Sequence, residues 1–432
     1  MSRIAAGRSA GIGVAAALIT GATLGNIGST LMPILLPGMA DRYHLSSTGT
    51  GTIATLQLIM TALVTLVLTS RAARPGRVRI ARIGLIASVA GFALAAAAPD
   101  LTALTAGNIV AGAGLGAVNA AGMAAIAATD DTDRASFVAV LGATLVIAAL
   151  VVALPEAQNT WGGSAEFAVL AVCCIPALWL VRPLPDAPTR DLEPAAVAPV
   201  PVMFLIAVAV LGASDQGAWS YSATLGEKYE GMSADTVSMV LAVASFASLA
   251  GVLVCGVAVP RFGRIPLIAA FVLVEALAKL VIAAVPWWVS FIVSAVIWQV
   301  CFMALLVLVL AVAAAADSSG RWVASATGAL AIGTALGPAP SGWILDTLGA
   351  TAFGAVLAIT TVVAAVPLLR TTRAASALAA SASEQSPARS SNTEPLPACS
   401  HAGSLQTFPA GQTSDRSVCR GRCGVCPVCG SA

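Results

Sequence analysis

The chain has 432 residues, of which 58% are hydrophobic and 10% are charged, and its formal net charge is +2. An ordinary soluble domain carries roughly 25% charged residues. The composition therefore excludes a soluble globular enzyme and a disordered scaffold. It also excludes a nucleic-acid-binding protein, because no basic stretch on a soluble face is available to neutralise phosphates. What remains is a chain that crosses a lipid bilayer many times.

Twelve apolar stretches are long enough to cross a bilayer as helices. The bilayer core is about 30 Å thick, so a crossing helix needs roughly 20 mostly apolar residues. A barrel strand would instead alternate polar and apolar residues over roughly 10 positions. The first stretch is too long for the apolar run of a signal peptide, about 7–15 residues, so we expect a retained helix. The predicted fold is all-α, with spans at residues 11–38, 49–69, 80–98, 102–128, 136–154, 165–181, 199–222, 236–259, 265–285, 288–316, 322–345 and 349–369.

The basic residues between the spans predict how the chain is oriented. Cytoplasmic loops collect Arg and Lys. If the N-terminus is inside, the outer loops hold only Arg42 and Lys228. We therefore expect both termini in the cytoplasm and a multi-pass protein of the plasma membrane. The inner segments would then hold Arg3, Arg8, Arg71, Arg74, Arg77, Arg79, Arg82, Arg134, Arg182, Arg190, Arg261, Arg264, Arg321, Arg370 and Arg373.

A stretch rich in proline and charge, residues 182–198, separates six spans from six spans. It is typical of a cytoplasmic linker. We therefore predict an N-terminal six-helix bundle over 1–181, the linker over 182–198, a C-terminal six-helix bundle over 199–373 and a disordered tail over 374–432. Similar turns follow span 2 and span 8, Arg74-Pro75-Gly76-Arg77 and Arg261-Phe262-Gly263-Arg264. Arg-x-Gly-Arg at the same place in each half favours a duplicated half over a chance match.

With this six-plus-six plan, inside termini and paired Arg-x-Gly-Arg loops, the chain resembles the major facilitator superfamily over about residues 11–373. The usual loop signature of that family is Gly-x-Leu-Ala-Asp-Arg-x-Gly-Arg. Here the acidic position is Ala73 in one copy and Pro260 in the other, and Asn108 stands where helix 4 often carries Arg. The resemblance implies two bundles that rock about a central substrate site near the midplane. It also implies that helices 1, 4, 7 and 10 line that site, and that Arg74, Gly76, Arg77, Arg261, Gly263 and Arg264 form conformational loops.

Three ionisable residues lie deep in predicted spans, where a charge costs roughly 2.5–3.5 kcal/mol on insertion scales. Asp215 is on span 7, next to Gln216, with Trp219 one turn on. A carboxylate in a low-dielectric cavity can exchange protons near neutral pH, so Asp215 is our candidate for proton coupling or cation contact. The alternative is that helix 7 ends early or kinks, which would make Asp215 a hydrated vestibule residue or a cap.

Glu275 and Lys279 are spaced i,i+4 on span 9, in the favourable order for a helix pair. We favour a structural ion pair, because helix 9 is usually peripheral in the resembled family. A second coupling site, in which protonation of Glu275 frees Lys279, is the alternative.

Polar and aromatic residues on spans 1, 4, 7 and 10 form a candidate substrate pocket, an apolar cleft with a few convergent polar groups. Asn26 and Thr30 share a face of span 1 at a spacing of four residues. Each residue taken alone is more often a packing residue than a ligand contact, and only their coincidence on these four helices supports a pocket. The set is Asn26, Thr30, Asn119, Asp215, Gln216, Trp219, Trp298 and Gln299.

Several kinds of nucleotide-binding, catalytic and metal-binding site have little or no support in the sequence. Neither lysine follows a glycine, so an ATP-binding Walker loop is excluded, and no His-Glu-x2-His motif is present. We predict neither an enzyme nor a cofactor. The tail ends in four cysteines that are a weak candidate for a metal site, since their spacing matches no usual zinc or ferredoxin pattern. They are Cys419, Cys423, Cys426 and Cys429.

The combined prediction is a monomeric secondary active transporter of a small organic solute that works by alternating access with H⁺ as the coupling ion. Both uptake and efflux stay open. The pocket set contains an acid and no base, which favours neutral or cationic solutes. The alternative from another class is a non-transporting receptor or scaffold that signals through its Cys-rich tail, motivated by the missing loop acid and the missing helix-4 Arg.

Overall fold

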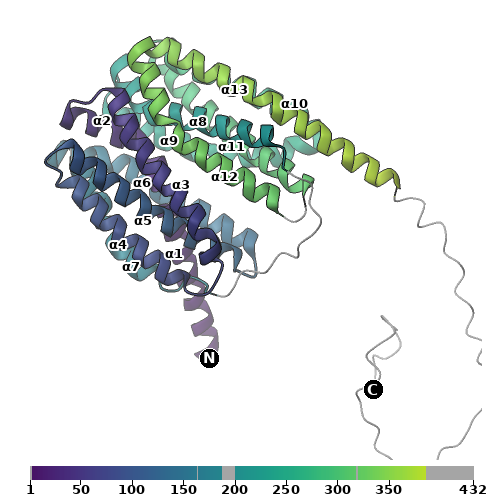
Figure 1. Ribbon diagram of the computed structural model, residues 1–432, viewed down its shortest axis with the longest axis horizontal. Helices are drawn as coiled ribbons and strands as arrows, with labels where there is room; N and C mark the ends of the chain where they lie inside the picture. Colours follow the sequence, from purple (N-terminus) through teal and green to yellow (C-terminus); the bar gives the residue numbers. More distant parts are fainter. Residues whose placement is uncertain (1, 163, 187–199, 318–319, 386–432) are drawn as a thin grey trace, which may run out of the picture. The chain divides into compact units, whose positions relative to one another are not determined.

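The computed structural model describes residues 2–162, 164–186, 200–317 and 320–385, and every regular element in these ranges is helical (Figure 1). A five-residue π-helix, η1 (Leu225–Tyr229), follows α8 directly. The α-helices are α1 (Ser2–Thr30), α2 (Met32–Tyr43), α3 (Ser47–Ala72), α4 (Arg77–Ala96), α5 (Leu101–Ala127), α6 (Thr132–Trp161), α7 (Ala165–Leu180), α8 (Val202–Thr224), α9 (Ala234–Phe262), α10 (Arg264–Ala284), α11 (Trp288–Ala316), α12 (Arg321–Leu336) and α13 (Pro338–Gln385).

The described helices agree with twelve crossings. Ten segments are long and apolar enough to span a membrane. One of them, Arg321–Ala374, has 54 residues, and roughly 20 suffice for one crossing. The shorter apolar helix α7 has 16 residues. The all-α membrane fold is therefore confirmed, while the count of twelve and the cytoplasmic termini stay predictions.

The first predicted span, 11–38, is two helices rather than one. The break falls at Leu31, whose φ and ψ are −91° and 1°. Pro33 lies in the first turn of α2, where a residue without an N–H fits because that donor would have no partner inside the helix. α2 then continues to Tyr43, five residues past the predicted end.

The predicted span 322–345 is also interrupted, because α12 ends at Leu336 and α13 begins at Pro338. α13 contains a second break at Gly349, whose φ of 79° favours glycine. This break separates the last two predicted spans as expected. α13 then runs on to Gln385, so the tail boundary predicted after residue 373 falls inside a helix.

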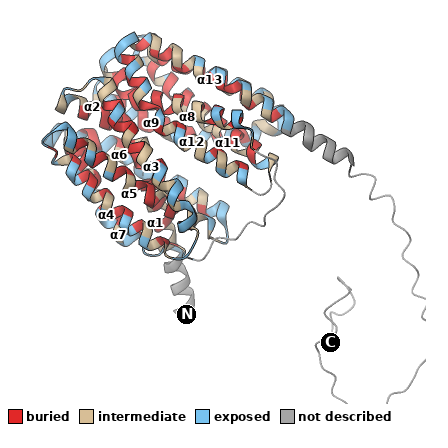
Figure 2. Cartoon of the chain, in the orientation of Figure 1, coloured by how far each residue is buried: buried red, intermediate tan, exposed pale blue. Residues whose placement is uncertain are grey.

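Small residues let α3 and α5 pack backbone against backbone. Gly112 of α5 lies so close to α3 that a Cβ there would collide with the carbonyl oxygen of Gln57. Thr61 Oγ1 donates to the carbonyl oxygen of Gly112 at 3.0 Å, and Thr65 Oγ1 donates to that of Gly116 at 3.1 Å. Buried residues line the inner faces of the helices, and many outward faces carry exposed apolar side chains such as Leu253, as a lipid-facing surface requires (Figure 2).

The segments before and after residues 182–198, called here the two halves, meet where α2 contacts α8, α3 contacts α12 and α6 contacts α9. The hydrogen bonds that join them cluster towards one end. There the Asp346 carboxylate accepts from the backbone N–H groups of Ser47 and Thr48, at 3.1 and 2.6 Å. Tyr221 Oη donates to the carbonyl oxygen of Ser47 at 2.7 Å. This Asp346 end is closed by direct contact between the halves.

Candidate substrate and proton site

A buried cluster of charges lies among helices of the second half. Lys279 and Glu275 are both fully buried on α10. Lys279 Nζ lies 2.5 Å from Glu275 Oε1, the contact that their i,i+4 spacing predicted. Because both side chains have 0% exposure, the pair shields itself from lipid.

Asp215 of α8 belongs to the same cluster. Its Oδ1 accepts a hydrogen bond from Trp298 Nε1 of α11 at 2.6 Å and lies 3.8 Å from Lys279 Nζ. The Asp215 side chain is 10% exposed, whereas Lys279 and Glu275 have no exposure. α8 continues for nine residues beyond Asp215, to Thr224, so Asp215 is a mid-helix residue rather than a cap. Asp215 is thus the member of the cluster that solvent can reach.

Two hydroxyls complete the surroundings of the Lys279 ammonium. Ser214 Oγ lies 3.4 Å and Thr361 Oγ1 3.3 Å from Nζ, and the two hydroxyls lie 3.0 Å apart. An ammonium has three donors, which Glu275, Ser214 and Thr361 use. Our sequence analysis missed both hydroxyls, because a single Ser or Thr in an apolar helix gives no distinctive signal.

The cluster holds one base and two acids. With both carboxylates ionised it would carry a net charge of −1 inside the membrane, where a charge costs roughly 2.5–3.5 kcal/mol on insertion scales. Glu275 Oε2 is buried without a hydrogen-bond partner. One proton on either Asp215 or Glu275 would make the cluster neutral.

The aromatic part of the site reaches the first half. Trp219 Nε1 donates to the carbonyl oxygen of Thr30 at 2.9 Å, and Gln216 Nε2 donates to that of Ser29 at 3.0 Å. The rings of Trp219 and Trp298 pack edge to face with centroids 6.1 Å apart. The structure therefore connects five of the predicted pocket residues: Thr30, Asp215, Gln216, Trp219 and Trp298.

The other three predicted pocket residues are not joined to Asp215 by hydrogen bonds in the described ranges. Asn26 is exposed, and its Nδ2 donates to the carbonyl oxygen of Ala22 on its own helix at 2.9 Å. Asn119 of α5 packs against Gly25, where a Cβ would lie 2.6 Å from its Oδ1. Gln299 is half-buried next to Trp298. Their part in binding a solute stays a prediction.

Comparisons with known protein families and solved structures agree with the helical membrane fold. The family model of the Major Facilitator Superfamily matches residues 16–229.

Over residues 16–229 the chain belongs to the major facilitator superfamily.

This is a family of transporters rather than enzymes. Among curated proteins no relative matches.

Solved structures of other superfamily members share the fold. A D-xylose–proton symporter aligns with a TM-score of 0.67 at 14% identity, covering 83% of this chain and 97% of that one. A bacterial homologue of the human lysosomal transporter Spinster, inward-facing and occupied, aligns with 0.65 at 19%, covering 84% and 96%. The nucleoside transporter NupG aligns with 0.64 at 13%, covering 83% and 98%.

The first superfamily loop is clamped by an acid that our sequence analysis did not single out. Asp186, at the start of the predicted linker, accepts from the backbone N–H of Gly76 at 2.9 Å and from that of Arg77 at 3.0 Å. Arg77 is fully buried, and its Nη1 donates to the carbonyl oxygen of Ala124 at 2.7 Å. Although Ala73 occupies the usual acidic position, the loop therefore still has a carboxylate. The signal that could have revealed it is an acid that follows two prolines directly after span 6.

The second loop also turns at a glycine with positive φ, but it has no such clamp in the described ranges. Gly76 and Gly263 both have positive φ, 106° and 77°, a conformation that favours glycine. Arg74, like Arg261, is exposed, and Arg264 is half-buried. The two loops thus share a glycine with positive φ, but they differ in the ψ of that glycine, 10° and 167°, and in their partners.

The weak metal candidate in the tail lies outside the described residues. Within the described ranges, no group of three His, Cys, Asp or Glu side chains is arranged to hold a metal ion.

Proposed function

We propose that this superfamily member is a secondary active transporter that moves a small organic solute by alternating access and couples the movement to H⁺ through Asp215. The observation that carries the proposal is the buried cluster with one base and two acids. Asp215 is its least buried member, bonded to Trp298 and 3.8 Å from Lys279. A solute that approaches Asp215 would compete with a proton for this carboxylate or would share it with the proton.

Closure at one end supports the alternating-access part of the proposal. Asp346 and Tyr221 hold the two halves together around the start of α3. If the termini are cytoplasmic, as the loop arginines predict, this is the outer end and the cytoplasmic end is the one that opens. The fold likeness to a Spinster homologue described as inward-facing agrees with that assignment.

The surroundings of Asp215 favour a neutral or cationic solute. The accessible group is a carboxylate flanked by two indoles, and indole faces attract cations. The only base in the cluster, Lys279, is fully buried behind them. We propose that the protein works as a monomer in the plasma membrane without a cofactor; the direction of transport is open.

The receptor alternative loses part of its motivation in the structure. It relied on the missing loop acid, and Asp186 supplies a carboxylate to Gly76. It also relied on the missing Arg of helix 4, where Asn108 is buried and bonded to Leu104 of its own helix. The transporter is therefore the function that the described geometry favours.

The proposal is tested with purified protein in liposomes that contain a pH-sensitive dye. A panel of organic cations, neutral solutes and anions is added outside, and proton movement is recorded for wild type and for Asp215→Asn. We expect at least one compound to move protons in wild type and none to do so in the variant. Asp235→Asn, an exposed carboxylate in the first turn of α9, is the matched control and should behave as wild type. Proton movement that persists in Asp215→Asn would contradict the proposal.

A further inference from the structure

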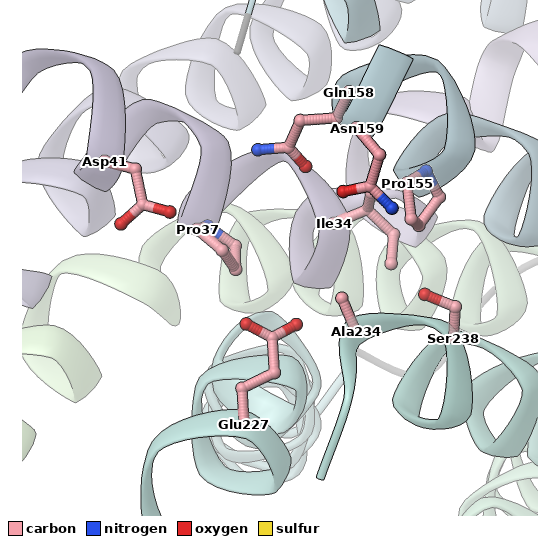
Figure 3. Close-up of a pocket in the computed structure, with 9 residues that line it drawn as sticks. All are labelled: Ile34, Pro37, Asp41, Pro155, Gln158, Asn159, Glu227, Ala234 and Ser238. Atoms are coloured by element: carbon pink, nitrogen blue, oxygen red, sulfur yellow. The ribbon is translucent and has the colours of Figure 1, made fainter. Parts of the chain in front are cut away.

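A pocket of about 170 Å³ lies between the two halves and shares no lining residue with the Asp215 cluster. α2 and α6 of the first half form one side, and η1 and α9 of the second half form the other (Figure 3). It is near the Asp346 end, because α2 ends four residues before α3 begins there. Its polar lining consists of Asp41, Gln158, Asn159, Glu227 and Ser238.

The charged residues that line this pocket are all acidic. Figure 3 shows the carboxylates of Asp41 and Glu227 on opposite sides of the pocket, one from each half. All five polar side chains carry an oxygen that can face a positive charge. Among the lining residues there is no Lys, Arg or His.

Glu166 of α7 adds a third carboxylate, which lies behind the residues that line the pocket. It is fully buried, and neither of its oxygens has a hydrogen-bond partner. A Cβ atom added to Gly38 would collide with the carboxyl group of Glu166. Gly38 is on the same face of α2 as the lining residues Ile34 and Asp41, since residues three and four apart are neighbours on a helix. The Glu166 carboxyl therefore points to the pocket side of α2, and Asp41 and Glu227 both act on it electrostatically.

We infer that this pocket is a cation site. Three carboxylates converge on one region of a closed interface, and one of them is buried with no donor of its own. A positive charge between the halves would offset the repulsion between these like charges.

The size of the pocket defines the class of ligand. One water occupies about 30 Å³ of liquid, so about 170 Å³ is too large for a bare metal ion. The described acids also do not form a group of three that could coordinate a metal directly. The ligand is therefore an inorganic cation that keeps its water shell, or the ammonium group of a small organic molecule.

The site has a consequence for the conformational cycle. Its two lining carboxylates come from different halves, so a cation between them stabilises the conformation in which the Asp346 end is closed. This role goes beyond the proposed transport function and does not depend on Asp215.

The test measures the unfolding temperature of the purified full chain against increasing MgCl2, KCl or tetramethylammonium chloride. We expect a saturable rise in wild type and a half-saturating concentration at least about tenfold higher in Asp41→Asn/Glu227→Gln, equivalent to about 1.4 kcal/mol. Asp235→Asn should match wild type, and comparison in the same salts removes the general effect of ionic strength. Saturation by MgCl2 or KCl identifies a hydrated inorganic cation, and saturation by tetramethylammonium alone identifies an organic one.

A second measurement avoids reliance on the double variant. Equilibrium dialysis of Asp215→Asn with the same probes should still give about one saturable cation per chain, because the site is independent of Asp215. Failure of the transport proposal would leave this result unchanged. No saturable binding, or identical salt responses in wild type and the double variant, would overturn the cation site.

Discussion

The Asp186 carboxylate accepts a hydrogen bond from the backbone N–H of Gly76 at 2.9 Å, across 110 residues of chain. It meets that loop where α4 begins, and the N-terminus of a helix has N–H groups without partners and a partial positive charge. The acid that the superfamily usually places within the loop is thus replaced here by one from the segment after α7. The start of the linker therefore helps to hold the loop between α3 and α4 in place.

Asp186→Asn should loosen that loop. The Asp186 side chain is 43% exposed, so we expect a loss of about 1 kcal/mol in stability, less than the roughly 1.5–3 kcal/mol of a buried hydrogen bond to a charged group because solvent screens it. The measurement is the unfolding temperature together with proteolysis of the loop after α3. Asp130→Asn, an exposed carboxylate between α5 and α6, is the matched control. Equal behaviour of the two variants would show that Asp186 does not clamp the loop.

Lys279→Met should be the most damaging single change in the cluster. It leaves Asp215 and Glu275 buried without their cation, and an uncompensated buried charge costs about 3–5 kcal/mol. Glu275→Gln added to Lys279→Met removes one acid together with the base, so the double variant should recover much of the folded yield. The comparison is the monodisperse fraction after purification. If the double variant is no better than the single one, charge balance is not what holds the cluster together.

Gly51→Ala should prevent closure at the Asp346 end. A Cβ at Gly51 would collide with Tyr221 Oη and lie 2.6 Å from the carbonyl oxygen of Pro338. Overpacking of this kind costs about 1–3 kcal/mol, and separation of the halves relieves it. Spin labels at the exposed residues Thr52 and Thr347 should therefore show a longer distance.

The control for this experiment is Gly256→Ala on α9, where a Cβ would meet nothing within 4 Å. That variant should keep the wild-type distance between the labels. An unchanged distance in Gly51→Ala would mean that the close approach at Gly51 does not set the conformation.

The sequence predicts local features of this protein well. The contact between Glu275 and Lys279 follows from helix geometry alone, and the spans follow from apolar length. The break at Leu31, just before Pro33, was not predicted, because proline in an apolar helix is compatible with a bend as well as with an end. The break at Gly337 has the same origin at Pro338.

Contacts between helices could not be predicted in this way. Nothing in the spacing of Asp215 and Lys279 says that their side chains meet, so the contact of Asp215 with the ion pair emerged only from the fold. Glu166, too, resembles an ordinary acid in the first turn of a helix. Its burial against Gly38 depends on how α7 packs near α2.

The central claim is that Asp215 carries the transported proton. The most direct test imposes a pH gradient across liposomes and measures the uphill accumulation of a solute that the panel identifies, with solute exchange at equal pH measured in parallel. We predict that wild type accumulates the solute, and that Asp215→Asn loses accumulation while it retains exchange. Gradient-driven accumulation by Asp215→Asn at the wild-type level would contradict the account.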